Sequence, residues 1–171
     1  AGLVGQAEFV ELPIPAPGPG QALVRPRLIA LCGSDVRIVY YAPREEYPMA
    51  VGRNGHEVIA RVEAINGQAE GVKVGDLVLA LIPGEPGMAE YFLTSVENLL
   101  PLPPGLSPEH SLMAQQLGTV IYACKRLPNL MGKDAVVIGQ GSAGLFFDAV
   151  LRRMGAHRVI ALDVKDARLE L

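Results

Sequence analysis

The run GQGSAG, residues 139–144, has residue types and a spacing that could hold a dinucleotide. It follows the apolar run AVVI and opens a segment that can form a helix. The first glycine permits a tight turn, the second lets the backbone approach a pyrophosphate, and the third lets helix and strand pack closely. The start of the helix offers unpaired N–H groups to phosphate oxygens. The candidate contacts are Gly139, Gly141, Ser142, Ala143 and Gly144.

Asp163 ends a second strand-like run, RVIAL, about 20 residues past the glycine turn. A carboxylate at this point can accept hydrogen bonds from a ribose diol, and its charge would repel a 2′-phosphate. The two runs with the glycine turn between them therefore predict a site that prefers NAD to NADP. The alternative is a glycine-rich turn between strand and helix that binds nothing.

Cys32 and His56 are a second candidate for chemistry, because a thiolate and an imidazole are both ligands of Zn²⁺. Cys32 follows an expected strand and His56 precedes another, while Gln115 lies in an expected helical stretch. Taken alone, a cysteine such as Cys32 is more often a small buried residue than a ligand, and a histidine such as His56 is more often structural or on the surface. These residues leave both alternatives open.

The elements that must position these groups divide the chain into a β-rich part and an α/β part. Short β-branched runs between Gly/Pro turns predict strands over residues 21–31, 58–65, 77–82 and 90–94. A helix then starts with Ser107 as N-cap and Pro108 as its first residue, and reaches Arg126 or Leu127, with Gly118 as a candidate break. We expect one domain over residues 1–127 and a second that starts at residue 128.

The second domain has room for two strands between Gly132 and Leu171, whereas a complete doubly wound domain has about six. We therefore expect residues 128–171 to be an incomplete NAD-binding domain that stops after its first βαβ unit, as a helix over residues 165–171 begins. We also expect the 171-residue chain to be inactive by itself.

The composition indicates a folded globular chain, with half of the residues hydrophobic and 19% charged. The net charge of -3 shows no excess of positive charge of the kind that binds nucleic acid. No apolar run reaches the roughly 20 residues that span a bilayer, and the N-terminus lacks the pattern of a signal peptide. The two cysteines, Cys32 and Cys124, favour reduced thiols over a disulfide framework. We expect a cytoplasmic protein without membrane or nucleic-acid partners.

Four segments resemble, in their order and spacing, the zinc-type medium-chain dehydrogenase/reductase family, which includes alcohol, sorbitol and threonine dehydrogenases. They are residues 32–35, 55–57, 72–76 and the glycine run with Asp163. The resemblance covers nearly the whole chain. It implies a β-rich GroES-like catalytic domain followed by an α/β Rossmann domain, with the active site in the cleft between them. It also implies a homodimer or homotetramer for the full-length protein.

The activity that this resemblance implies is NAD-dependent oxidation of a secondary alcohol or polyol to its ketone, and the reverse reaction, assisted by zinc. Cys32, His56 and Gln115 stand at the positions of the catalytic zinc ligands. Ser34 matches the position of the proton relay, and Asp35 that of the carboxylate that orients the ligand histidine. Glu57 matches the acid that lies beside the zinc or binds it transiently, and Thr119 the residue packed near the nicotinamide.

Three positions depart from the family pattern. The family usually has Cys, Asp or Glu where this chain has Gln115, and a neutral amide is a poor zinc ligand. The loop over residues 83–88 lacks the four cysteines that bind a structural zinc in many relatives, so we expect no structural zinc. Arg37 replaces a histidine of some proton relays and cannot release a proton; it contacts cofactor or an anionic substrate, or is a surface arginine.

Gln115 also keeps two other hypotheses open. One is a zinc-free NAD(P)H-dependent quinone or alkene reductase of the same superfamily, which Gln115 favours and the set of Cys32, Asp35 and His56 opposes. The other is a non-catalytic nucleotide-binding relative, which the intact glycine run opposes.

Overall fold

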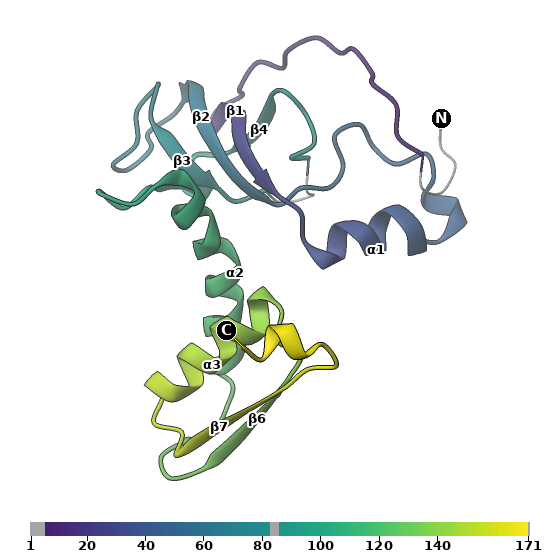
Figure 1. Ribbon diagram of the computed structural model, residues 1–171. Helices are drawn as coiled ribbons and strands as arrows, with labels where there is room; N and C mark the ends of the chain where they lie inside the picture. The colour runs from purple at the N-terminus through teal and green to yellow at the C-terminus, as the bar shows by residue number, and fades with distance from the viewer. Residues whose placement is uncertain (1–5, 83–85, 171) are drawn as a thin grey trace. The chain divides into compact units, whose positions relative to one another are not determined.

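The computed structural model describes residues 6–82 and 86–170, and its residues form two compact units (Figure 1). The first unit runs to Leu112 and the second starts at Met113. Both of these residues lie in helix α2 (Pro108–Cys124), so one helix supplies side chains to two cores. The predicted boundary at residue 127 refers to the complete domains and not to these two compact units, so it stays a prediction.

The first unit is built on a five-stranded antiparallel sheet in the order β4-β1-β2-β3-β5. Both faces of this sheet are covered. Val24, Val58 and Val78 are fully buried on one face, while Ile59 packs with Leu112 of α2 on the other. The strands are β1 (Gln21–Ala30), β2 (Glu57–Asn66), β3 (Leu77–Ala80), β4 (Phe92–Ser95) and β5 (Leu99–Pro101).

Helix α1 (Gly33–Tyr41) follows directly after Cys32 and leaves the end of β1 (Figure 1). The sequence reasoning expected no helix here. Cys32 is the N-cap, and its backbone N–H donates to the carboxylate of Asp35, three residues later. This bond satisfies a donor that would otherwise have no partner at the helix start. The helix therefore begins at the residue that is also a candidate metal ligand.

Helix α2 is continuous over its 17 residues, so the candidate break at Gly118 is wrong. A helical glycine costs about 1 kcal/mol relative to alanine, and the packing of the helix offsets this cost. Val120 and Cys124 are almost fully buried against Leu151 and Val137 in the core of the second unit.

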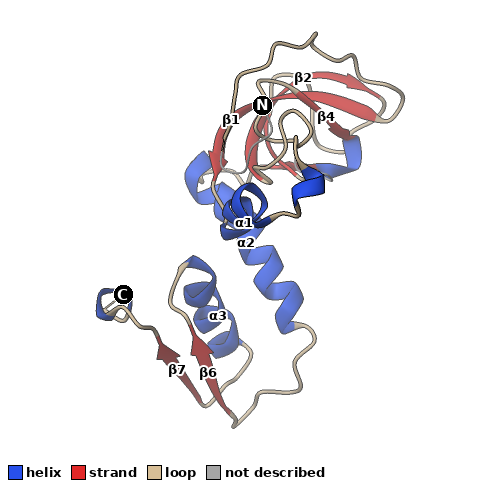
Figure 2. Ribbon diagram, turned by 90° about the vertical axis from the view of Figure 1, so that its right-hand side faces the viewer, coloured by secondary structure: helices blue, strands red, loops and turns tan. Residues whose placement is uncertain are grey.

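The second unit contains a βαβ motif, as the sequence predicted. Strand β6 (Asp134–Ile138) and strand β7 (Arg158–Leu162) pair in parallel, and helix α3 (Ser142–Arg153) connects them and packs on the pair (Figure 2). Beyond β7 the expected helix over residues 165–171 is only a 3₁₀ turn over Asp166–Arg168. The N–H groups of Arg168 and Leu169 donate to carbonyl oxygens three residues back, which is the 3₁₀ pattern. Leu171 lies outside the described residues.

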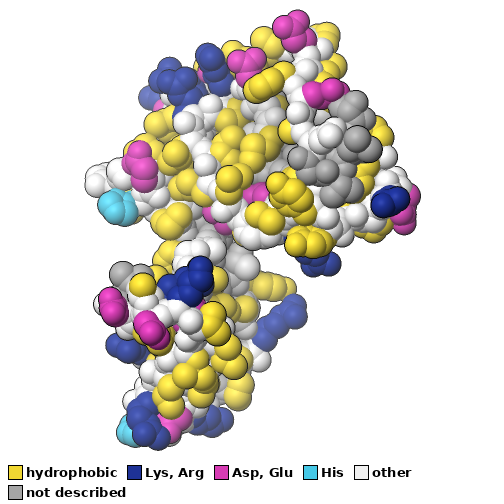
Figure 3. Space-filling view, turned by 45° about the vertical axis from the view of Figure 1, so that its right-hand side comes forward, with side chains coloured by type: hydrophobic (Ala, Val, Ile, Leu, Met, Phe, Trp, Pro, Cys, Tyr) yellow, Lys and Arg dark blue, Asp and Glu magenta, His cyan; other side chains and the backbone are white. Residues whose placement is uncertain are grey.

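One face of the β6–β7 sheet carries apolar side chains that no described element covers. Val136 and Ile138 are 56% and 84% exposed, and their register partners Ile160 and Leu162 are 41% and 47% exposed. Hydrophobic side chains gather on the visible surface of this unit (Figure 3). Residues on the opposite face, including Val137, pack with α3 residues. The sheet is therefore covered on one face only.

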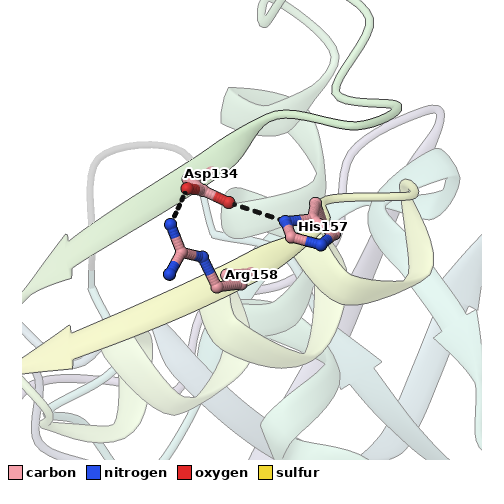
Figure 4. Close-up of polar contacts among 3 residues, drawn as sticks. All are labelled: Asp134, His157 and Arg158. Atoms are coloured by element: carbon pink, nitrogen blue, oxygen red, sulfur yellow. Dashed lines mark hydrogen bonds and ion pairs between the residues drawn. The ribbon is translucent and has the colours of Figure 1, made fainter.

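An ion cluster lies where β6 and β7 begin (Figure 4). Asp134 accepts a hydrogen bond from Arg158, and its other carboxylate oxygen lies 3.1 Å from Nδ1 of His157. The Arg158 and His157 bonds lower the pKa of Asp134 to about 2. The cluster lies at the strand ends away from the glycine turn, where it links the first residue of β6 to the first residue of β7.

No helix among the described residues combines the length and apolarity needed to cross a membrane.

Candidate functional site

Three donor side chains meet in the first unit although they come from two separate segments. Cys32 precedes α1, while His56 and Glu57 stand at the start of β2. Their ligand atoms all lie within 4.8 Å of one another. Cys32 and His56 are half-buried, and Glu57 is only 4% exposed. A thiolate, an imidazole and a carboxylate are a donor set that suits Zn²⁺. The sequence reasoning placed Glu57 beside the metal or as a transient ligand, and its position within this group is compatible with both roles.

Asp35 joins the two segments that carry these donors. One of its carboxylate oxygens accepts the Cys32 N–H at 2.7 Å, and the other accepts the Gly55 N–H at 2.9 Å. The carboxylate is buried and lies 3.9 Å from Nδ1 of His56, which is an ion-pair distance and too long for a hydrogen bond. Asp35 therefore holds the His56 segment through the backbone of the preceding residue.

The electrostatics of this cluster favour a cation. Burial raises the pKa of Glu57, and the neighbouring Asp35 raises it further, while His56 and a hydrogen bond with Cys32 oppose the rise. Glu57 is almost fully buried, and a carboxylate charge in such a place is costly unless it is compensated. A bound divalent cation would compensate this charge, so the residues present fit a zinc ion.

Ser34 adds a hydroxyl beside this donor set along the chain. Its Oγ is buried and has no hydrogen-bond partner among the described residues. Because buried hydroxyls are nearly always paired, this one is a candidate to bond a group that does not belong to the described residues, and its role in a proton relay stays a prediction. Arg37, which belongs to the same helix, is exposed.

Gln115 and Thr119 lie on α2 in the part of the chain assigned to the second unit. Gln115 is half-buried, Thr119 is exposed, and the Thr119 hydroxyl donates to the Gln115 carbonyl at 3.3 Å. The geometry of the first unit groups Cys32 and His56 with Glu57. The zinc-ligand role of Gln115 and the nicotinamide contact of Thr119 stay predictions. Cys124 belongs to the core of the second unit, where burial raises the pKa of its thiol.

The three glycines of the run 139–144 have three different environments. Gly139 has φ 98°, a left-handed conformation that favours glycine. Gly141 is the N-cap of α3, and a Cβ there would meet nothing within 4 Å, so its backbone faces open space. A Cβ at Gly144 would overlap the Gly139 carbonyl oxygen, so α3 can approach the turn only with glycine here. Ser142 and Ala143 form the first turn of α3, where free N–H groups can bind an anion.

Asp163 closes the glycine turn from the end of β7. Its side chain is 3% exposed, and its carboxylate accepts the N–H groups of Gln140 at 2.7 Å and Lys165 at 2.9 Å. Arg168 lies 3.3 Å from one of the oxygens. These bonds, the Gln140 bond first, lower the pKa of Asp163, so it is ionised at neutral pH. The sequence reasoning missed Arg168, although a cation shortly after the acid is a detectable signal.

Comparison with known proteins supports the fold described above. Residues 18–104 match the family described as the alcohol dehydrogenase GroES-like domain. The chain is 27% identical over 188 residues to an L-threonine 3-dehydrogenase of Stenotrophomonas maltophilia, an alignment that covers 94% of this chain and 55% of the relative. The chain thus spans about half the length of the curated relatives that it matches.

Two solved structures share the fold. Galactitol-1-phosphate dehydrogenase of Escherichia coli is similar with a TM-score of 0.78 at 21% identity, over 97% of this chain and 55% of that one. Quinone oxidoreductase of Thermus thermophilus, whose complex with NADPH is known, has a TM-score of 0.74 at 28% identity, over 96% of this chain and 52% of that one. These similarities confirm the predicted order of a GroES-like domain followed by the start of a Rossmann domain.

Proposed function

The chain belongs to the zinc-type medium-chain dehydrogenase/reductase family, and we propose that it carries the metal site and the start of the cofactor site of an NAD-dependent oxidoreductase. The proposed reaction interconverts a secondary alcohol or polyol and its ketone. The observation that carries this proposal is the meeting of Cys32, His56 and Glu57 around one point in the GroES-like unit.

Cys32, His56 and Glu57 would hold the zinc ion and leave its fourth position open to the substrate oxygen, with Glu57 in place of the neutral Gln115 as third ligand. When bound, zinc would polarise the substrate oxygen and lower the pKa of the alcohol. The Ser34 hydroxyl, buried and without a partner among the described residues, would accept the alcohol proton and pass it toward solvent. Asp35 keeps the Cys32 and His56 segments together, so the donor atoms are arranged before the metal arrives.

The glycine turn of the second unit would hold the cofactor, which supplies the hydride acceptor. Gly141 lets the backbone approach the pyrophosphate, and the first N–H groups of α3 would bind it. The ionised Asp163 favours NAD, because its charge opposes a 2′-phosphate. Arg168 partly offsets that charge and would lie on the ribose side of the turn.

Metal content and nucleotide binding test the proposal directly. The purified chain should bind about one zinc per chain, and Co²⁺ substitution should give the visible absorption of a thiolate-coordinated metal. Cys32→Ser should abolish both signals, while the buried Cys124 serves as the matched control through Cys124→Ser. NADH should bind more tightly than NADPH in a fluorescence titration. A full-length protein that binds neither metal nor nucleotide would contradict the proposal.

A zinc-free quinone or alkene reductase is the second candidate, and Gln115 is the observation that favours it. The similarity to the quinone oxidoreductase of Thermus thermophilus adds support. In the full-length protein, NADH oxidation with a quinone acceptor that survives chelation, together with no metal bound, would select this candidate. Oxidation of secondary alcohols that chelation abolishes would select the first. A homodimeric or homotetrameric state and a cytoplasmic location also stay predictions for the whole protein.

A further inference from the structure

The segment that leads into His56 has an unusual backbone. Gly52, Asn54 and Gly55 all have left-handed φ values, of 78°, 93° and 75°. Such values are uncommon for a residue with a side chain, and Asn54 is also 6% exposed. A conformation of this kind persists only when surrounding structure fixes it. The position of His56 therefore depends on whatever holds residues 52–55.

Residues 86–89, between β3 and β4, hold this segment from one side. The Met88 N–H donates to the carbonyl oxygens of Gly52 at 3.0 Å and Asn54 at 3.1 Å. Asn54 also forms a parallel bridge with Pro86. A Cβ at Gly52 would lie 3.2 Å from the Ala89 Cβ, so the two segments are in close contact.

Gly87 approaches the segment most closely. It is buried, and a Cβ at this position would overlap the carbonyl oxygen of Gly55. The φ of Gly87 lies outside the left-handed region, so the contact and not the backbone conformation requires glycine. The N–H of Gly55 donates to Asp35. Gly55, the residue before His56, is thus held at its N–H by Asp35 and at its carbonyl by Gly87.

We propose that residues 86–89 are a clamp that positions His56 for metal binding, with Gly87 and Met88 as its positioning residues. This inference rests on the proposed function, because it assigns a role in the same metal site. It gives the loop that lacks the cysteines of a structural zinc site a function of its own, carried by backbone contacts. The clamp touches the residue before the ligand and does not itself contact the metal.

The substitution Gly87→Ala tests the clamp, since its methyl group must push residues 86–89 away from Gly55. We expect the affinity for Zn²⁺, measured by competition with a chromophoric chelator, to fall about 10–100-fold, as for other residues that orient metal ligands. In the apo chain we expect faster hydrogen exchange of the Gly55 amide and shifted Gly55 and His56 amide signals in NMR spectra. Gly118→Ala is the matched control, because a Cβ there meets nothing within 4 Å, and it should change none of these.

Met88→Ala is a second test of the clamp that still applies if the Gly87→Ala variant does not fold. The Met88 side chain is 42% exposed, and its Cγ and Cε lie within van der Waals distance of the position of a Gly55 Cβ. The variant keeps the backbone N–H, so we expect a native melting temperature with about a threefold loss of Zn²⁺ affinity. Unchanged Gly55 exchange and Zn²⁺ affinity in both folded variants would overturn the clamp. If the unsubstituted chain binds no zinc, the proposed function fails, and the apo NMR signals still decide about the clamp.

Discussion

The two units hold their candidate sites in different ways. In the first unit a sheet covered on both faces carries the donors, and contacts between segments far apart in sequence, such as Asp35 with Gly55, bring them together. In the second unit the glycine turn consists of the consecutive residues 139–144, Asp163 is the one distant residue of the site that bonds to it, and only one face of the sheet is covered by described elements. The metal site thus depends on tertiary structure, whereas the cofactor turn is largely a local structure.

Asp35→Ala should cause the largest loss of stability and of metal binding, and its effect should be confined to the first unit. It removes two hydrogen bonds to a carboxylate and leaves the Gly55 N–H unpaired, so we expect a loss of about 3–5 kcal/mol of unfolding free energy. Zn²⁺ binding should be lost, while NADH binding is kept. Urea unfolding followed together with both binding assays checks this. Loss of NADH binding would show that the two sites are not separate.

Gly144→Ala should break the second unit's site alone. Its methyl group would separate α3 from the glycine turn, and we expect destabilisation by about 1–3 kcal/mol together with weaker NADH binding. Gly141→Ala is the informative partner, because its Cβ has open space: NADH binding should fall with little change in stability. Thermal unfolding and fluorescence titration measure the two effects. Equal destabilisation by both variants would contradict the different roles of these glycines.

A comparison of the Zn²⁺ affinities of Glu57→Gln and Gln115→Ala tests whether the metal site belongs to the first unit. Glu57 is one of the three grouped donors, so its loss of charge should lower Zn²⁺ affinity roughly 10-fold or more. Gln115→Ala should change the affinity only about twofold, since a neutral amide contributes little. Chelator competition gives both values. A greater loss from Gln115→Ala would make α2 the essential source of ligands.

Acid should weaken the second unit through Asp134, with a smaller effect. Its pKa is lowered from 3.8 to about 2 in the folded chain, so the carboxylate stabilises the fold above pH 3.8. This contribution is lost as the pH falls from about 4 toward 2. Asp134→Asn should flatten that part of the pH dependence of unfolding, measured by circular dichroism. An unchanged slope would show that Asp163, whose pKa is also lowered, dominates the acid response.

The sequence predicted local patterns well and long-range contacts poorly. Strands β1 to β4 and the βαβ motif follow from β-branched runs and glycine turns, which act over a few residues, whereas the three-residue strand β5 was missed. Helix α1 was missed because Val36, Ile38 and Val39 have low helix propensity, while its start is fixed by Asp35, which also bonds to Gly55.

The candidate site divides in the same way. Cys32, His56 and the glycine run carry their chemistry in their residue types, so the sequence could identify them. The contact of Gly87 with Gly55 depends on how two loops pack, which no spacing reveals.

The placement of the cysteines gives each unit its own chemical reporter. Cys32 is half-buried at the candidate metal site, and Cys124 is 1% exposed in the core of the second unit. A thiol reagent should therefore label Cys32 in the folded chain, and metal should protect it, whereas Cys124 should react only when the second core opens. The rates of labelling at the two positions would report occupancy of one site and opening of the other unit in a single experiment.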